Sequence, residues 1–342
     1  MKRSLLLIIV CCVASFCFSK EKIPAPKWLD SPHSQYSSKE YFAAVGIDKN
    51  RNMAELKAVE KIAGIFSRDV KSVSKAGTHM ASRQEGDCFT GTTVDSSLNR
   101  VILSEIDQED LIGIELAEAF FDEKHDTWYA LALMNKEKTA DLYFELVKKN
   151  SSAIKSLVAS SEKLEPSMRK IAYQYRALKL AQLNESYFPR FFIIHPEKCE
   201  NAKKLNVSSD SLRLSLDKTA VQVPVEVSVT NDKNAIAETA CEELLKSFGI
   251  VVNSKNPKYS LNFEINPSYR TVQNPLIYYC EFTISADLKS KSDSKLVPWS
   301  FSGRAGGKNE ELAKQKAYSL IAEKIKTDYL KVFEEYFYGE TE

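Results

Sequence analysis

The most regular pattern of hydrophobic and polar positions lies in the last third of the chain. Apolar and polar residues alternate from position 221 to position 229, which predicts a half-buried β-strand. The apolar set is Val221, Val223, Val225, Val227 and Val229. Pro224 lies on the polar face and has no N–H group, which favours an edge position in a sheet. The unpaired backbone groups of an edge strand could accept a strand of another protein, so these valines form a candidate partner-binding edge.

The segments that follow this strand complete a small domain. Helical spacing predicts a helix over 236–248 that Gly249 ends, and an amphipathic helix is expected from Asn309. Alternation predicts strands at 259–265, 278–288 and 299–301. The order strand, helix, three strands, helix predicts an α+β domain over 218–342, in which helices cover one face of an antiparallel sheet.

The first half of the chain has a similar order of elements. Alternation from Tyr41 to Ile47 predicts a strand, and Asn52 is expected to cap the helix that follows. The predicted inner face of this helix is Leu56, Val59, Ala63 and Phe66. Further strands are expected at 70–73, 112–121 and 127–133, with a loop over 76–97 and a charged turn at 122–126. These elements predict an α+β domain over 41–150.

Helical periodicity fills the middle of the chain. Apolar residues recur at helical spacing after Asn135, Pro166 interrupts the pattern, and a second helical run starts at Met168. We expect an antiparallel helical hairpin over 151–188, followed by a polar linker over 189–217. The predicted fold is therefore α+β, with two small antiparallel-sheet domains packed with helices and joined by a helical hairpin.

The N-terminus has the features of an export signal. Lys2 and Arg3 precede an apolar run that ends at Phe18, and the small residue Ser19 follows. The run is shorter than the roughly 20 residues of a membrane-spanning helix. Residues 1–19 are therefore interpreted as a cleaved signal peptide, with a retained anchor as the alternative. Residues 20–40 are rich in proline and serine and predict an extended leader. Export from a bacterium-like cell places the mature chain in the periplasm.

Charge argues against nucleic acid as a partner. Removing Lys2 and Arg3 from the 47 basic residues leaves 45, against 46 acidic residues. A near-neutral chain without a basic block lacks the electrostatic footprint of a nucleic-acid-binding protein.

Four of the seven cysteines remain after the predicted cleavage, namely Cys88, Cys199, Cys241 and Cys280. None belongs to a Cys-x-x-Cys unit, so a redox motif is not indicated. Cys241 and Cys280 both fall on predicted inward faces. They are either a buried disulfide or two small core residues, because free cysteine is itself among the most buried residue types.

Three short segments carry a family resemblance: Pro26-Lys27-Trp28-Leu29, then 41–46, then Trp128-Tyr129-Ala130-Leu131-Ala132 before a helix. They resemble the LPP-twenty lipoprotein family of bacterial envelope proteins, over about the first half of the mature chain. The resemblance implies a non-enzymatic envelope domain over 41–150, often lipid-anchored to the outer membrane, and related domains occur in the flagellar assembly protein T. It brings no catalytic residues.

The same resemblance makes Cys12 and Cys17 candidate lipid acceptors. The lipoprotein pattern places a small residue before the acceptor, whereas Cys17 follows Phe16 and Cys12 follows Cys11. Secretion into the periplasm without a lipid is the simpler interpretation.

No motif for catalysis or for a cofactor stands out. The four histidines are scattered, and none has a partner at helical ligand spacing. The glycine-rich run 303–308 precedes a helix but lacks the spacing of a phosphate-binding loop, so a strand-to-helix turn is the better interpretation.

We therefore expect a non-enzymatic envelope protein, without a cofactor, that acts by protein recognition or assembly. Its partners would be other envelope proteins, and it could associate with the outer membrane or with peptidoglycan. One alternative is a structural component of a flagellar or cell-wall apparatus. A cell-wall hydrolase is less favoured, because it would need a pocket with converging polar groups.

Overall fold

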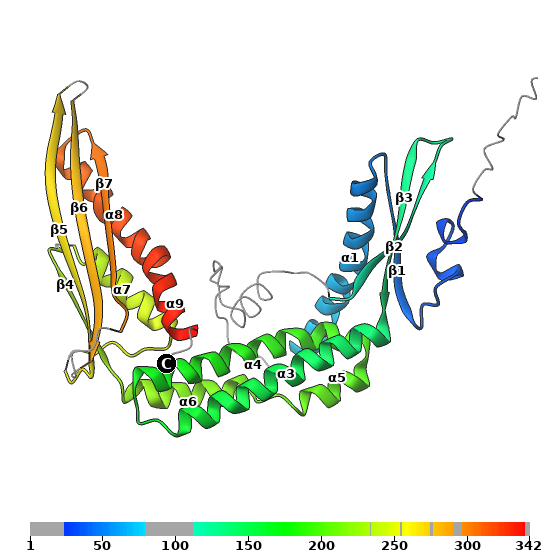
Figure 1. Cartoon of the computed structure of the whole chain (residues 1–342), viewed down its shortest axis with the longest axis horizontal. Coiled ribbons are helices and arrows are strands. Elements are labelled where there is room, and N and C mark those ends of the chain that lie inside the picture. The colour runs from blue at the N-terminus through cyan, green and yellow to red at the C-terminus, as the bar shows by residue number, and fades with distance from the viewer. Residues whose placement is uncertain are drawn as a thin grey trace, which may run out of the picture. The chain divides into compact units, whose positions relative to one another are not determined.

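The computed structural model describes residues 24–78, 112–232, 234–253, 255–273, 276–290 and 296–338 (Figure 1). Within these ranges the chain forms two compact units. The first comprises 24–62 and 115–133, and the second comprises the remaining described residues. Both contain helices and a sheet, which confirms the α+β prediction. The predicted signal peptide, with Cys12 and Cys17, lies outside the described residues, as does Cys88.

The first unit is built on a three-stranded sheet. Its strands are β1 (Tyr41–Asp48), β2 (Ile114–Asp122) and β3 (Thr127–Asn135), in the order β1-β3-β2. The charged turn between β2 and β3 is held by a contact of 2.6 Å between His125 Nδ1 and Asp122 Oδ2, and Asp126 adopts a positive φ of 48°. The predicted strands 112–121 and 127–133 and their hairpin are thus confirmed.

Helix α1 (Arg51–Thr78) approaches the sheet unusually closely. A Cβ atom on Gly46 of β1 would lie 1.9 Å from the carbonyl oxygen of Ala54 and 2.4 Å from the amide nitrogen of Ala58. Ala54, Ala58 and Ile62 have no exposed surface. Only glycine on the strand and alanine on the helix leave room for this contact, so small residues set the helix–sheet distance.

The face and the cap of α1 differ from the sequence prediction. Leu56, expected on the inner face, is 49% exposed, because the alanine stripe faces the strand in its place. The cap is Asn50 and not Asn52, since Asn50 Oδ1 accepts hydrogen bonds from the amides of Asn52 and Met53. A large side chain on the inner face would have pushed the helix away from Gly46, so Leu56 lies on the exposed side of the helix.

The strand expected at 70–73 is also wrong, because α1 continues through this segment to Thr78. Two valines separated by polar residues are a short local signal, whereas adding residues to an existing helix costs little free energy. The expected loop over 76–97 begins inside this helix, and its part beyond Thr78 lies outside the described residues.

The leader is not extended in its described part, 24–40. It forms two short 3₁₀ turns, Lys27–Leu29 and Pro32–Ser34. Trp28 is completely buried, and its indole Nε1 donates a hydrogen bond of 2.6 Å to Glu118 Oε2 on β2. Burial of a large aromatic ring with a satisfied N–H group stabilises the leader on the sheet.

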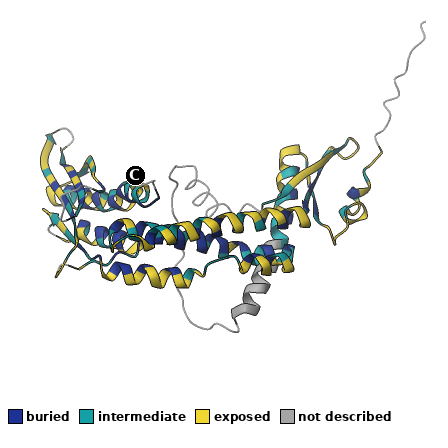
Figure 2. Cartoon of the chain, turned by 60° about the horizontal axis from the view of Figure 1, so that its bottom comes forward, coloured by how far each residue is buried: buried dark blue, intermediate teal, exposed yellow. Residues whose placement is uncertain are grey.

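Four helices of the second unit follow β3: α3 (Lys136–Glu162), α4 (Met168–Ile194), α5 (Pro196–Lys203) and α6 (Ser209–Val221). Helices α3 and α4 form the predicted hairpin, but each is longer than the segment 151–188 allowed, and α4 runs through Pro189. Their buried residues lie along the faces that meet (Figure 2). Asn184 on α4 bonds to Asn150 and to Asn206, each over 2.9 Å, which fixes the register of the packed helices.

The expected linker over 189–217 is helical instead. His195 caps α5 by accepting a hydrogen bond from the Lys198 amide, and Pro196 occupies the first turn. In α6 the residues Leu212, Leu216 and Ala220 recur every four positions and are buried. The many polar residues of this segment cover the outer faces of two short helices, so a polar composition did not mean a loop.

The second sheet contains β4 (Val225–Thr230), β5 (Tyr259–Gln273), β6 (Leu276–Ser290) and β7 (Trp299–Gly307), in this order. Its helices are α7 (Ile236–Ser247), α8 (Glu310–Lys324), a π-helical turn (Ile325–Tyr329) and α9 (Leu330–Tyr338). These helices pack on one face of the sheet (Figure 1). The sheet is mixed and not fully antiparallel, because α7 carries the chain back across the sheet and β4 and β5 run parallel.

A cluster of aromatic rings joins the helices of this unit. Phe337 of α9 has its ring centroid 4.7 Å from that of Phe248 and 5.7 Å from that of Tyr175 on α4. Phe333 packs against Phe248 and against Tyr329, which in turn meets Phe263 of β5 at 5.1 Å. The cluster therefore connects α4, α9 and the sheet through one continuous core.

Candidate functional site

The strand that the valine alternation predicted begins at Val225 and not at Val221. Val221 is the last residue of α6 and is 69% exposed, whereas Val223 is buried in the turn before the strand. The strand starts at Val225, because the buried leucine stripe extends α6 to 221 and Pro224 forces the chain to open into an extended conformation. Strand β4 does lie at one end of the sheet order. Its role as a binding edge stays a prediction.

Much of the outer side of β4 is already occupied. The Val225 amide donates to Val251 O and the Asn253 amide donates to Val225 O, each over 2.9 Å. Backbone groups of alternate residues point to the same side of a strand. The N–H and C=O groups of Val227 and Val229 therefore also point outward, as those of Val225 do. These two valines are the remaining outward-facing residues of β4 before Thr230, and they offer a short edge.

The opposite edge, β7, is more open. The Leu296 amide donates to Leu288 O over 2.9 Å, which shows that even-numbered residues of β6 direct their backbone groups toward β7. The register pairs Ala286 with Trp299, so odd-numbered residues of β7 bond to β6. The even-numbered residues then face outward: Ser300, Ser302, Arg304 and Gly306. Among the described residues, these outward backbone groups have no hydrogen-bond partner.

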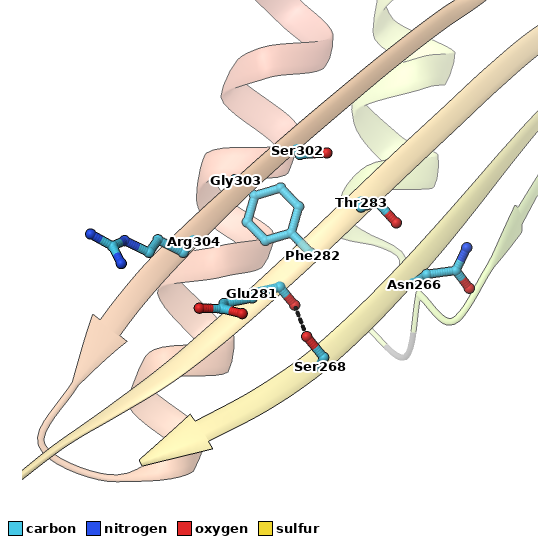
Figure 3. A pocket seen from close by; sticks show the side chains of 8 residues that line it. All are labelled: Asn266, Ser268, Glu281, Phe282, Thr283, Ser302, Gly303 and Arg304. Carbon is cyan, nitrogen blue, oxygen red and sulfur yellow. Dashed lines mark hydrogen bonds between the residues drawn. The ribbon is translucent and has the colours of Figure 1, made fainter. Parts of the chain in front are cut away.

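A shallow depression of about 440 Å³ lies beside this edge, on the face of the sheet away from the helices (Figure 3). It is lined mainly by polar side chains, among them Asn266, Glu281 and Ser302. Figure 3 shows the side chain of Arg304 projecting past the outer side of β7. The Arg304 guanidinium lies 5.5 Å from the centre of the Tyr279 ring. The edge thus combines free backbone groups with a positive charge.

The hydrophobic pattern of the sequence did not indicate β7 as an edge. The feature that could have indicated this edge is the run 303–307. Its three glycines were interpreted as a turn, whereas the segment belongs to strand β7. Gly303 is needed there because a Cβ atom would lie 2.8 Å from the Phe282 ring and 2.9 Å from the Phe301 ring. Glycine in a strand often marks such a close approach.

The two cysteines predicted as a bridge or as core residues are free, buried thiols. Cys241 belongs to α7 and Cys280 to β6. Burial raises the pKa of both thiols, and Cys280 shares a hydrogen bond with Tyr269 on the neighbouring strand. The disulfide is therefore not formed, and both residues serve as small core side chains. Cys199 is likewise a buried free thiol.

Within the described ranges no cluster of histidine, cysteine, aspartate or glutamate could hold a metal ion. None of the helices described by the structure is long and apolar enough to span a membrane.

One carboxyl group in the second unit titrates far from its ordinary range. Burial raises the pKa of Glu334 on α9 to about 7, although the ammonium groups of Lys331 and Lys179 oppose the shift. Glu334 Oε2 has no hydrogen-bond partner among the described residues. Burial also lowers the pKa of Lys179 on α4, and the Arg213 charge adds to that effect. Tyr175 and Tyr338 face the same carboxyl group.

The second unit should accordingly become more stable as the pH falls. An acid whose pKa is higher in the folded state than in the unfolded state binds a proton on folding, so the free energy of unfolding increases as the pH falls from 7 to the unfolded value of 4.5. Because the group is partly solvated, we expect a gain of about 1 kcal/mol. Urea unfolding at a series of pH values should show this slope in the wild type and a smaller slope in Glu334→Gln. Equal slopes would contradict the assignment.

No family model and no curated protein matches the sequence. Several solved structures resemble parts of the chain, among them the following three. The minor lipoprotein of Acinetobacter baumannii is 12% identical, with 34% of this chain and 90% of that chain covered and a TM-score of 0.26. The secreted protein HP1454 of Helicobacter pylori is 11% identical, with 83% and 97% covered and a TM-score of 0.36. Rare lipoprotein B of Shewanella oneidensis is 8% identical, with 33% and 92% covered and a TM-score of 0.24.

These structures are bacterial lipoproteins and a secreted protein, and all three TM-scores are below 0.5. The function of this chain must therefore be inferred from its own residues.

Proposed function

We propose that this chain is an exported protein of a bacterial cell envelope that binds another protein and does not catalyse a reaction. The partner adds a strand to the open edge of β7. The partner is another envelope protein, and through it the chain associates with the outer membrane or with peptidoglycan. The proposal of export rests on the predicted signal peptide 1–19. Its charged start, short apolar run and small residue at Ser19 are typical of such peptides.

The observation that carries the binding proposal is the run of four outward-facing residues on β7, from Ser300 to Gly306. Natural sheets protect their edges with proline, with charges, with short strands or with a covering segment. The β4 edge has two of these protections, since Pro224 precedes it and residues 251–253 cover its start. The nine residues of β7 contain no proline and a single charge, Arg304. A strand of this length offers about 30 Å of pairing surface.

The chemistry of the edge indicates what the partner strand carries. The small residues of 303–307 leave the backbone accessible to a neighbouring strand. Arg304 has no ion pair among the described residues. A carboxylate on the partner strand beside Arg304 would complete a charge-assisted hydrogen bond. Main-chain pairing would supply affinity, and this charge would supply specificity.

Proline substitutions at the two edges test the proposal. Ser302→Pro removes one outward N–H and leaves the hydrogen bonds to β6 intact, because residue 302 faces away from β6. Val227→Pro makes the same change on β4. After cross-linking in the native envelope, we expect wild type, Ser302→Val and Val227→Pro to capture one common protein that Ser302→Pro does not capture, measured by mass spectrometry of the cross-linked species.

Circular dichroism of the purified variants should show that each retains the fold. Capture by Ser302→Pro at the wild-type level would exclude the β7 edge, and loss in Val227→Pro alone would assign binding to β4. Recovery of the chain from the cytoplasm and not from the envelope would contradict the export part of the proposal.

A further inference from the structure

A second surface of the molecule has the composition of a ligand site. A groove of about 520 Å³ lies between α3 and α6, with α4 as its floor. Small side chains on both walls leave this space open, namely Ala159 on α3 and Ser211 and Ser215 on α6. Ligand pockets in proteins commonly have volumes of about 300–1,000 Å³. None of the residues that line the groove belongs to β7, so this surface is independent of the function proposed above.

The floor of the groove contains a polar group that lacks a partner. The side chain of Gln174 is only 5% exposed, and its Nε2 donates a hydrogen bond of 3.0 Å to Ser215 Oγ. Its Oε1 atom is buried and has no donor among the described residues. Buried polar atoms in folded proteins nearly always have a hydrogen-bond partner, so an orphaned amide oxygen in the wall of a groove points to a missing donor.

The rim of the groove is positively charged. Lys155 on α3 and Lys218 on α6 line it, and neither forms an ion pair with another described residue. Lys170 on α4 also lines it and donates one hydrogen bond, 2.9 Å long, to Leu164 O. Glu162 is the one carboxylate among the lining residues. Three ammonium groups against one carboxylate favour an anionic ligand.

We infer that this groove binds a small hydroxylated anion, of the class of sugar acids and sugar phosphates. The lysines hold the anionic group through charge-assisted hydrogen bonds. A hydroxyl group of the ligand donates to Gln174 Oε1 when the side chains above it move aside. The hydroxyl of Ser215, which accepts from Gln174, can donate its own proton to a ligand oxygen. A carboxylate and a phosphate share this chemistry.

Thermal shift and NMR titration of the purified full chain test the inference with three probes. Glucuronate and glucose 6-phosphate are the anions, and glucose is the neutral control. We expect either anion to raise the melting temperature and to shift the amide signals of α3, α4 and α6, while glucose does neither. A response to one anion alone identifies carboxylate or phosphate as the preferred group.

Variants distinguish a binding site from a general charge effect. Lys155→Gln combined with Lys218→Gln should weaken anion binding about tenfold or more, because two charge-assisted contacts are lost. Lys149→Gln is the matched control, since Lys149 is exposed on α3 outside the groove. Equal affinities of the double variant and of Lys149→Gln would overturn the inference.

Gln174→Met separates the role in binding from a role in folding. It keeps the side-chain volume and removes the orphaned acceptor, so the melting temperature without ligand should be unchanged or higher, while the shift caused by the anion is lost. A retained shift in Gln174→Met, no response of the wild type to either anion, or a co-crystal structure with only water at Gln174 would each overturn the inference.

Discussion

Gly46→Ala is expected to destabilise the first unit strongly, whereas Gly64→Ala, the same change on α1, should stabilise the protein. The new methyl group at 46 would overlap the backbone of Ala54 and Ala58, and backbone atoms cannot move aside as a flexible side chain can. We expect Gly46→Ala to lower the free energy of unfolding of the unit by about 3 kcal/mol. At Gly64 a Cβ atom meets nothing within 4 Å. Alanine there should add about 0.5–1 kcal/mol through its higher helix propensity.

Hydrogen–deuterium exchange during urea unfolding measures both effects and locates them. The amides of β1 and of the first turns of α1 should lose protection in Gly46→Ala, while those of β5 and β6 keep theirs. Effects of the same sign at both glycines, or a loss of protection spread over both units, would contradict the close approach of strand and helix.

Phe337→Ala should have the largest effect on the second unit. The Phe337 ring is fully buried between Phe248 and Tyr175, and removing it leaves a cavity in the cluster that joins α9 to α4. We expect a loss of about 3–5 kcal/mol in the free energy of unfolding. Phe192→Ala, a change in a partly exposed ring on α4, should cost less than about 1 kcal/mol.

Urea unfolding followed by near-ultraviolet circular dichroism compares the two phenylalanine variants. The aromatic signal of the cluster should disappear at a lower urea concentration in Phe337→Ala than in Phe192→Ala. Coincident transitions would show that α9 does not depend on this cluster for its docking.

The fold could be predicted where a periodic pattern was long. The strands near Tyr41, Thr127 and Tyr259 and the helix ended by Gly249 are where alternation and helical spacing placed them. Predictions that rested on short sequence patterns were wrong. The valines at 70 and 73 lie in a helix that began 19 residues earlier, and the polar segment around Cys199 is helical because a few buried positions suffice for a short helix.

The candidate sites could be predicted only in part. An edge strand was expected from the valine alternation, and β4 is at the edge of its sheet. The openness of β7 depends on which backbone groups face outward, and this follows from the register with β6 and not from side-chain pattern. The groove at Gln174 brings together residues of three helices, so no spacing along the chain could have indicated it.

The π-helical turn Ile325–Tyr329 allows the last helical segment of the second unit to contact two different elements. A regular helix presents one stripe along its length, but the wider turn changes the angular phase of the residues that follow it. Helix α8 before the turn contacts β6 and β7, and α9 after it contacts α4. Residues 310–338 therefore connect the sheet to the helical hairpin. Because the Phe337 ring packs against Tyr175 of α4, we expect a change in the position of α8 on the sheet to alter the packing of α9 against the hairpin.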